Sequence, residues 1–237
     1  MRVFVAGKGG AGKTTVAAAL SSVLARRGVE VLAVDADGSP NLALALAAGD
    51  PERLPAVANA TSPPADETCT EPPLSAAHIT EEFVVESGLG VPMVQTGRIE
   101  RPSERCLCCG SHATAREVLS ALAEDDRRVV VADLEPGLND LLWAKPGPGD
   151  VVVVVTDASR RSVEVARRVL DVSAELGVER TLLVANRLRP DELDRIRSAF
   201  PDRESIEIAF DPRLDGAVPA ARLEDARTLA DLIVGSG

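Results

Sequence analysis

Apolar and polar residues divide the chain into two kinds of segment that follow one another. Short, almost entirely apolar runs are typical of strands buried on both faces of a sheet, and longer stretches with helical spacing separate them. The expected strands are 3–6, 29–34, 91–95, 129–133, 151–156, 181–185 and 206–210, and the expected helices are 14–27, 113–123, 161–176, 191–200 and 220–234. The alternation predicts an α/β fold with a mostly parallel, seven- to eight-stranded sheet and helices on both faces.

One segment breaks this pattern. Residues from about 59 to 80 carry Pro63, Pro64, Pro72 and Pro73 among acidic and small residues with little periodicity. Such a composition predicts an irregular insertion on the surface. A linker between two domains is the alternative, but the residues before it are too few to close a core alone. We therefore expect residues 1–237 to form a single domain with one long loop.

The first expected strand leads directly into a glycine-rich loop that opens the first helix. The loop is Gly-Lys-Gly-Gly-Ala-Gly-Lys-Thr-Thr, residues 7–15. In such a P-loop the backbone N–H groups and the helix dipole bind phosphates, Lys13 reaches the outer phosphates and Thr14 offers its hydroxyl to Mg²⁺. A tight turn that happens to contain Lys-Thr is the alternative. The candidate nucleotide-binding residues here are Gly9, Gly10, Ala11, Gly12, Lys13, Thr14 and Thr15.

A second lysine, Lys8, makes this loop more specific than an ordinary P-loop. Lys8, Lys13 and Lys145 are the three lysines of the chain, and a general bias toward arginine makes the two in the loop more informative, because they indicate a need for a compact ammonium. With Lys8, the loop resembles the deviant Walker A ATPases of the MinD, ParA and nitrogenase iron protein superfamily (SIMIBI class). The resemblance implies ATP hydrolysis and a nucleotide-closed homodimer in which Lys8 reaches the partner's nucleotide.

Two acidic segments follow expected strands at the edge of the sheet that should hold the nucleotide. Asp37 follows the second strand, and by resemblance to the family's first switch it orients or deprotonates the attacking water. Asp133 ends the strand 129–133 and is expected to hold Mg²⁺ together with Thr14, while the N–H of Gly137 senses the γ-phosphate. The alternative is that these acids merely end strands in turns.

The apolar strand expected at 181–185 leads to the candidate site for the base of the nucleotide. Asn186 follows residues 181–185 at the place where superfamily members contact adenine, and an amide can both donate to and accept from a purine edge. Asp211 and Pro212, after the next strand, are expected to contribute more weakly, and a loop-capping Asn is the alternative. The guanine motif Asn-Lys-x-Asp is absent, because residues 186–189 are Asn-Arg-Leu-Arg. We therefore expect ATP.

Three of the four cysteines, Cys106, Cys108 and Cys109, lie within four residues. Ser111 is expected to cap a helix, which would place the thiols near a helix N-terminus and favour the metal-binding thiolate. A Cys-x-Cys pair supplies two donors, so two subunits would supply four to nickel or zinc at a dimer interface. We favour Cys106 and Cys108 as ligands. Three small buried residues are the alternative, and Cys69 stays unassigned.

The context of these cysteines resembles the CooC-type ATPases that mature nickel enzymes such as carbon monoxide dehydrogenase. The matching segments are residues 97–100, His112, Arg116, residues 134–138 and residues 158–164, whereas Cys109, the proline-rich insertion and Glu135-Pro136-Gly137 depart from the pattern. The resemblance implies an ATP-hydrolysing dimeric switch that carries nickel or zinc to a client metalloenzyme. A Min/Par-type positioning or regulatory ATPase with structural cysteines is the alternative.

Charge and composition exclude several other classes. The net charge of −11 disfavours binding to nucleic acid or to an anionic membrane surface. No apolar run approaches the roughly 20 residues of a membrane span, and the N-terminus leaves no room for a signal peptide. We therefore expect a cytoplasmic protein with no nucleic-acid and no membrane partner.

Overall fold

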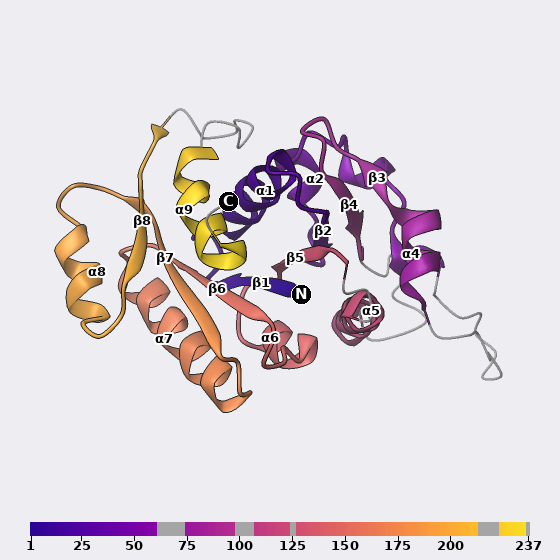
Figure 1. Cartoon of the computed structure of the whole chain (residues 1–237). Helices are drawn as coiled ribbons and strands as arrows, with labels where there is room; N and C mark the ends of the chain where they lie inside the picture. Colours follow the sequence, from indigo (N-terminus) through magenta and orange to yellow (C-terminus); the bar gives the residue numbers. More distant parts are fainter. Residues whose placement is uncertain (61–73, 98–106, 124–126, 213–222, 236–237) are drawn as a thin grey trace.

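The computed structural model describes residues 1–60, 74–97, 107–123, 127–212 and 223–235, with the backbone alone for residues 59–60, 107–112 and 223–225. The described residues form one eight-stranded sheet in the order β3-β4-β2-β5-β1-β6-β7-β8 (Figure 1). The strands are β1 Arg2–Gly7, β2 Val31–Ala36, β3 Val85–Glu86, β4 Pro92–Gln95, β5 Val129–Leu134, β6 Val151–Thr156, β7 Arg180–Leu188 and β8 Ser205–Ala209. Only β3 runs antiparallel to its neighbour in this sheet.

Helices cover both faces of the sheet (Figure 1). The helices that pack on one face are α1 (Lys13–Arg26), α2 (Leu42–Ala45) and α9 (Leu223–Val234). The helices that pack on the other face are α4 (Ala76–Phe83), α5 (Leu107–Ala123), α6 (Asn139–Ala144), α7 (Arg160–Glu175) and α8 (Leu193–Ala199). Two shorter elements are the 3-10 helix η1 (Pro51–Arg53) and α3 (Val57–Ala60). The predicted fold class is confirmed.

The buried core explains why the strands are apolar throughout. Within β1, Phe4 and Ala6 pack into the core beneath α4 to α8, whereas Val3 and Val5 pack into the core beneath α1, α2 and α9. Successive side chains of a strand point to opposite faces, so a strand covered on both faces must be apolar at every position. The phosphate loop therefore emerges from a fully buried strand.

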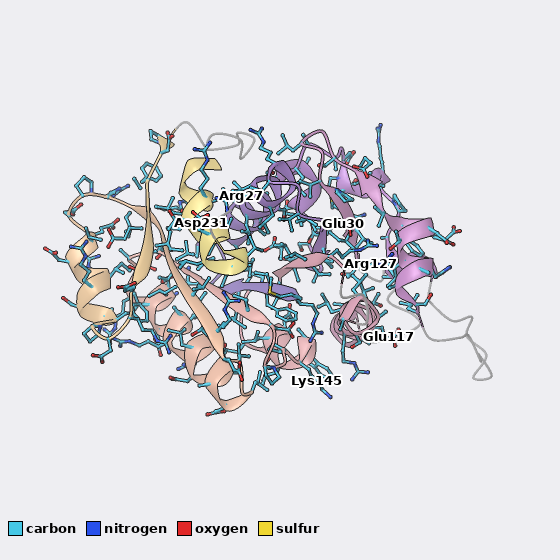
Figure 2. The ribbon with its side chains drawn as sticks, viewed as in Figure 1. Arg27, Glu30, Glu117, Arg127, Lys145 and Asp231 are labelled. Atoms are coloured by element: carbon cyan, nitrogen blue, oxygen red, sulfur yellow. The ribbon has the colours of Figure 1, made fainter. Side chains whose placement is uncertain are left out.

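An ion pair joins α1 and α9, which lie on the same face of the sheet. Arg27 follows α1 and pairs with Asp231 of α9 at 2.7 Å, and Figure 2 labels both residues where the two helices lie side by side. Both side chains are partly exposed, so this pair adds at most about 1 kcal/mol to stability. The burial of Leu229 and Ala230 against the sheet holds α9 in place.

The predicted irregular segment from 59 to 80 needs a correction. Residues 61–73 lie outside the described part of the chain, but α4 begins at Ala76, so the segment does not extend to Thr80. Ser75 caps this helix by accepting a hydrogen bond from the His78 N–H, and Ile79 and Phe83 bury one face of it. A cap followed by apolar residues four positions apart is a helix signal that the nearby prolines obscured.

No helix among the described residues is both long and apolar enough to cross a lipid bilayer.

Candidate functional site

The phosphate loop lies between β1 and α1 in a conformation that glycine makes accessible. A Cβ on Gly7 would lie 2.2 Å from the Val155 carbonyl oxygen of β6, so only glycine lets the two strands approach at this point. Gly12 has φ +95 and precedes α1 without a side chain that could cap the helix. The first N–H groups of α1 are therefore available to an anion, as phosphate binding requires.

Lys13 lies at the start of α1 and is buried, with 6% of its surface exposed. Burial lowers the pKa of its ammonium, and the nearby carboxylates of Asp133 and Asp37 act in the opposite direction. A buried cation surrounded by acids and beside free helix N–H groups is suited to the outer phosphates of a nucleotide.

Two carboxylates meet on neighbouring strands beside this lysine. Asp35 of β2 and Asp133 of β5 are partners in the parallel register, and both are buried. The Asp133 Oδ2 accepts a hydrogen bond from the Thr14 hydroxyl at 2.6 Å. Burial, and then the negative charge of Asp35, raise the pKa of Asp133 to about 8. The two carboxyl groups are therefore difficult to ionise together unless a cation lies beside them.

These residues fit a magnesium ion. The Asp133 Oδ1 is buried and has no hydrogen-bond partner in the described part of the chain, which is costly unless a cation or water completes the site. Mg²⁺ is typically held by one or two carboxylates together with substrate phosphates, and a P-loop hydroxyl is a usual ligand. Thr14 and Asp133 could therefore hold Mg²⁺ next to the phosphates.

Asp35 is a site residue that the sequence analysis missed. Its carboxylate accepts hydrogen bonds from the N–H groups of Leu42, at 2.8 Å, and Asp37, at 3.2 Å, so it fastens both ends of the loop between β2 and α2. Burial raises its pKa to about 6. The signal that could have found it is that Asp35 is the one polar residue in the otherwise apolar, buried strand β2.

Asp37 lies on the loop that Asp35 fastens and is partly exposed. Its Oδ1 accepts a hydrogen bond from the Ser39 N–H at 2.7 Å. Gly137 lies between β5 and α6 with φ +129, a conformation that favours glycine. Asp37 and Gly137 therefore follow β2 and β5, two strands that end beside the phosphate loop.

Asn186 lies inside β7 and not after it, because β7 continues to Leu188 across an irregularity in its pairing with β8. Its side-chain amide is buried and donates to the Ala11 carbonyl at 2.8 Å. A Cβ on Gly12 would lie 2.2 Å from the same amide nitrogen. Asn186 therefore holds the phosphate loop in this structure, and its contact with adenine stays a prediction, as do those of Asp211 and Pro212.

The comparisons with known proteins agree with this geometry. Residues 3–91 match the model of the CobQ/CobB/MinD/ParA nucleotide binding domain. An uncharacterized ATP-binding protein of Methanocaldococcus jannaschii is 31% identical over 81% of this chain and 76% of its own length. This chain belongs to that nucleotide-binding family. It is accordingly an ATPase, as the deviant P-loop predicted.

The chain is also similar to proteins of two kinds, a metalloenzyme accessory protein and a cell division ATPase. The carbon monoxide dehydrogenase accessory protein CooC of Rhodospirillum rubrum is 29% identical over 79% of this chain and 74% of its own length. The cell division ATPase MinD of Pyrococcus furiosus superposes with a TM-score of 0.68 at 22% identity, over 98% of this chain and 97% of that structure. The second likeness concerns the fold alone.

The cysteine cluster of this CobQ/CobB/MinD/ParA family member lies only partly within the described residues. Cys106 lies outside the described residues, as does Cys69, whereas Cys108 and Cys109 lie in the first turn of α5. The prediction that Ser111 caps this helix is wrong, because α5 already begins at Leu107. Where side chains are described, no group of three or more His, Cys, Asp or Glu could hold a metal ion. The Cys106 and Cys108 pair therefore stays a prediction.

Proposed function

We propose that this ATPase is a homodimeric switch that binds nickel or zinc through Cys106 and Cys108 at the subunit interface. It would assist metal insertion into a client such as carbon monoxide dehydrogenase. The observation that carries the proposal is the similarity to the CooC accessory protein over 200 residues, combined with the Cys-x-Cys segment at the start of α5. A helix N-terminus favours thiolate, the form that binds metal.

The nucleotide chemistry follows from the residues around the phosphate loop. Lys13 and the N–H groups of residues 9–15 would bind the phosphates, and Thr14 and Asp133 would hold Mg²⁺, which neutralises phosphate charge. Asp37 lies on a partly exposed loop fastened by Asp35, a position suited to orienting the attacking water. Gly137 would contact the γ-phosphate through its N–H.

The base would lie near β7 and the end of β8. Asn186 donates a hydrogen bond to the phosphate loop. Asp211 and Pro212 lie shortly after the neighbouring strand β8, which ends at Ala209. We propose that these three residues surround adenine.

Lys8 would complete the site of the partner subunit. Its ammonium donates to the carbonyl of the next residue, Gly9, at 3.1 Å, and the side chain is partly exposed. A contact with a neighbouring backbone carbonyl is readily exchanged for a phosphate oxygen, which is the stronger acceptor. This availability supports a role across the dimer.

Metal binding tests the proposal directly. Nickel or zinc would be measured per dimer, with and without a nonhydrolysable ATP analogue, in the wild type and in a Cys106→Ser, Cys108→Ser variant. We expect one ion per dimer in the wild type and none in the variant. Cys69→Ser is the matched control, because it removes one thiol outside the cluster. Equal uptake by the wild type and the double variant would exclude the metal role.

A Min/Par-type positioning or regulatory switch is the second candidate. It is favoured by the septum site-determining protein MinD of Synechocystis, which is 29% identical over 80% of this chain and 65% of its own length. In that case ATP would dimerise the double cysteine variant as well as the wild type, and neither protein would take up metal. Lys8→Ala should abolish hydrolysis under both candidates, since each depends on a nucleotide-closed dimer.

A further inference from the structure

Arg187 has an unusual backbone conformation beside the phosphate loop. It lies in β7, where the pairing with β8 is irregular, and has φ +61. A non-glycine residue in the left-handed region is uncommon and is often associated with a functional constraint. The conformation carries the Arg187 side chain to the outer side of the phosphate loop, where its Nη1 donates to the Gly10 carbonyl at 3.1 Å.

The carbonyl that Arg187 holds belongs to the turn that carries Lys8. The Ala11 N–H donates to the Lys8 carbonyl at 3.2 Å and closes a four-residue turn, in which Gly10 has φ +84. Positive φ at the third residue is typical of a type II turn. The Gly10 carbonyl and the Ala11 N–H share one planar trans peptide and point in opposite directions. Because Arg187 holds the Gly10 carbonyl outward, the Ala11 N–H stays directed at the Lys8 carbonyl.

Arg187 and Asn186 thus hold successive carbonyls of the loop, and they do so in different surroundings. Asn186 is buried and holds the Ala11 carbonyl, whose peptide plane contains the Gly12 N–H beside Lys13. Arg187 is exposed, like Gly10, and holds the part of the loop that carries Lys8. Phe210 lies under the Arg187 guanidinium, with its ring centroid 5.8 Å away, and helps to fix the arginine.

We propose that Arg187 is a positioning residue that presents Lys8 to the nucleotide of the partner subunit. This inference rests on the cross-dimer role of Lys8 given under the proposed function. Arg187 acts through the Lys8–Ala11 turn and does not itself contact the phosphates bound by Lys13. Its loss should therefore reduce kcat and nucleotide-dependent dimerisation, and it should leave the binding of ADP to the monomer nearly unchanged.

Arg187→Gly is the informative substitution. Glycine adopts the observed φ without strain, so the variant should fold at least as stably as the wild type while losing the guanidinium. We expect kcat to fall about tenfold, as for the loss of one charged hydrogen bond. The Kd for ADP should change by less than about twofold. Arg187→Lys should recover little, because an ammonium on a different stem cannot reproduce the guanidinium contact.

Arg189→Gln is the matched control. Arg189 also lies over the Phe210 ring, with a centroid distance of 5.6 Å, and this substitution removes the same charge from the same surface. It should leave kcat and the Kd for ADP at wild-type values. Thermal melting of all three variants would verify that each is folded.

The outcomes separate this inference from the proposed function. If Lys8→Ala hydrolyses ATP normally, the cross-dimer role of Lys8 is wrong, and this inference with it. If Lys8→Ala is inactive but Arg187→Gly keeps wild-type kcat, only the inference about Arg187 is wrong. An Arg187→Gly variant that weakens ADP binding with unchanged kcat would also overturn it. Dimerisation with the ATP analogue should be no weaker in a Lys8→Ala, Arg187→Gly double variant than in Lys8→Ala alone.

Discussion

Replacing Asp133 with asparagine should make the nucleotide-free protein less sensitive to rising pH. The folded-state pKa of Asp133 is about 8, against an ordinary value of 3.8, chiefly because its carboxyl is buried. An acid with a raised pKa contributes stability that is fully present below pH 3.8 and is lost as the pH rises toward 8, since the unfolded chain releases the proton first. Without Mg²⁺, wild-type stability should therefore fall between pH 5 and pH 7.

The size of the effect follows from one proton. Over those two pH units, at about 1.36 kcal/mol per unit, the wild type should lose about 3 kcal/mol of unfolding free energy relative to Asp133→Asn. Asparagine keeps an acceptor for the Thr14 hydroxyl, so the comparison isolates the charge. Urea unfolding with EDTA at both pH values measures it.

Asp202 is an exposed aspartate, and Asp202→Asn corrects for the removal of one negative charge from a chain whose net charge is −11. A stability difference between the wild type and Asp133→Asn that stays the same at pH 5 and pH 7 would refute the raised pKa. Asp133→Asn should also lose Mg²⁺-dependent ATP hydrolysis.

Three further substitutions test the rest of the site. Gly12→Ala places a Cβ 2.2 Å from the Asn186 amide nitrogen at a residue with φ +95. We therefore expect the variant to lose about 2 kcal/mol of unfolding free energy and to bind ADP at least tenfold more weakly by calorimetry, and an unchanged melting temperature would contradict this. Thr14→Ala should bind ADP in EDTA like the wild type but lose the gain in affinity that Mg²⁺ provides, and a preserved gain would remove Thr14 from the metal site. Asp150→Ala breaks a nearly buried ion pair with Arg2, whose charged atoms lie 2.6 Å apart. It should lower the unfolding free energy measured in urea by about 3 kcal/mol and leave ADP affinity unchanged, whereas reduced affinity would show that the ion pair also affects the nucleotide site.

Local signals in the sequence carry most of the fold and the phosphate site. All seven predicted strands are present, because strands buried on both faces need continuous apolar runs. The glycine loop is predictable because spacing along the chain alone defines a P-loop. A carboxylate that ends an apolar strand, such as Asp133, is expected at the carboxyl-terminal edge of a parallel sheet. These features need no knowledge of distant contacts.

The missed features depend on packing or on weak local signals. The short helices α2 and α6 contain too few residues to show a helical period. The start of α5 was placed too late because Gly110 and Ser111 resemble a turn, although a helix tolerates a glycine at about 1 kcal/mol. Asp35 and Arg187 gain their meaning only from strand register and from a backbone irregularity, neither of which the sequence displays.

The phosphate loop is held by contacts on two sides. On one side Asn186 and Arg187 of β7 hold two successive carbonyls of the loop, and on the other Asp133 holds Thr14. A loop held by these contacts requires little ordering when nucleotide binds, so under the proposed function we expect the nucleotide signal to arise elsewhere. We expect the signal to arise in the two segments proposed to lie beside the γ-phosphate. The Asp37 loop and the segment containing Gly137 connect buried strands to α2 and α6, so a shift of either would reach the surface through those helices.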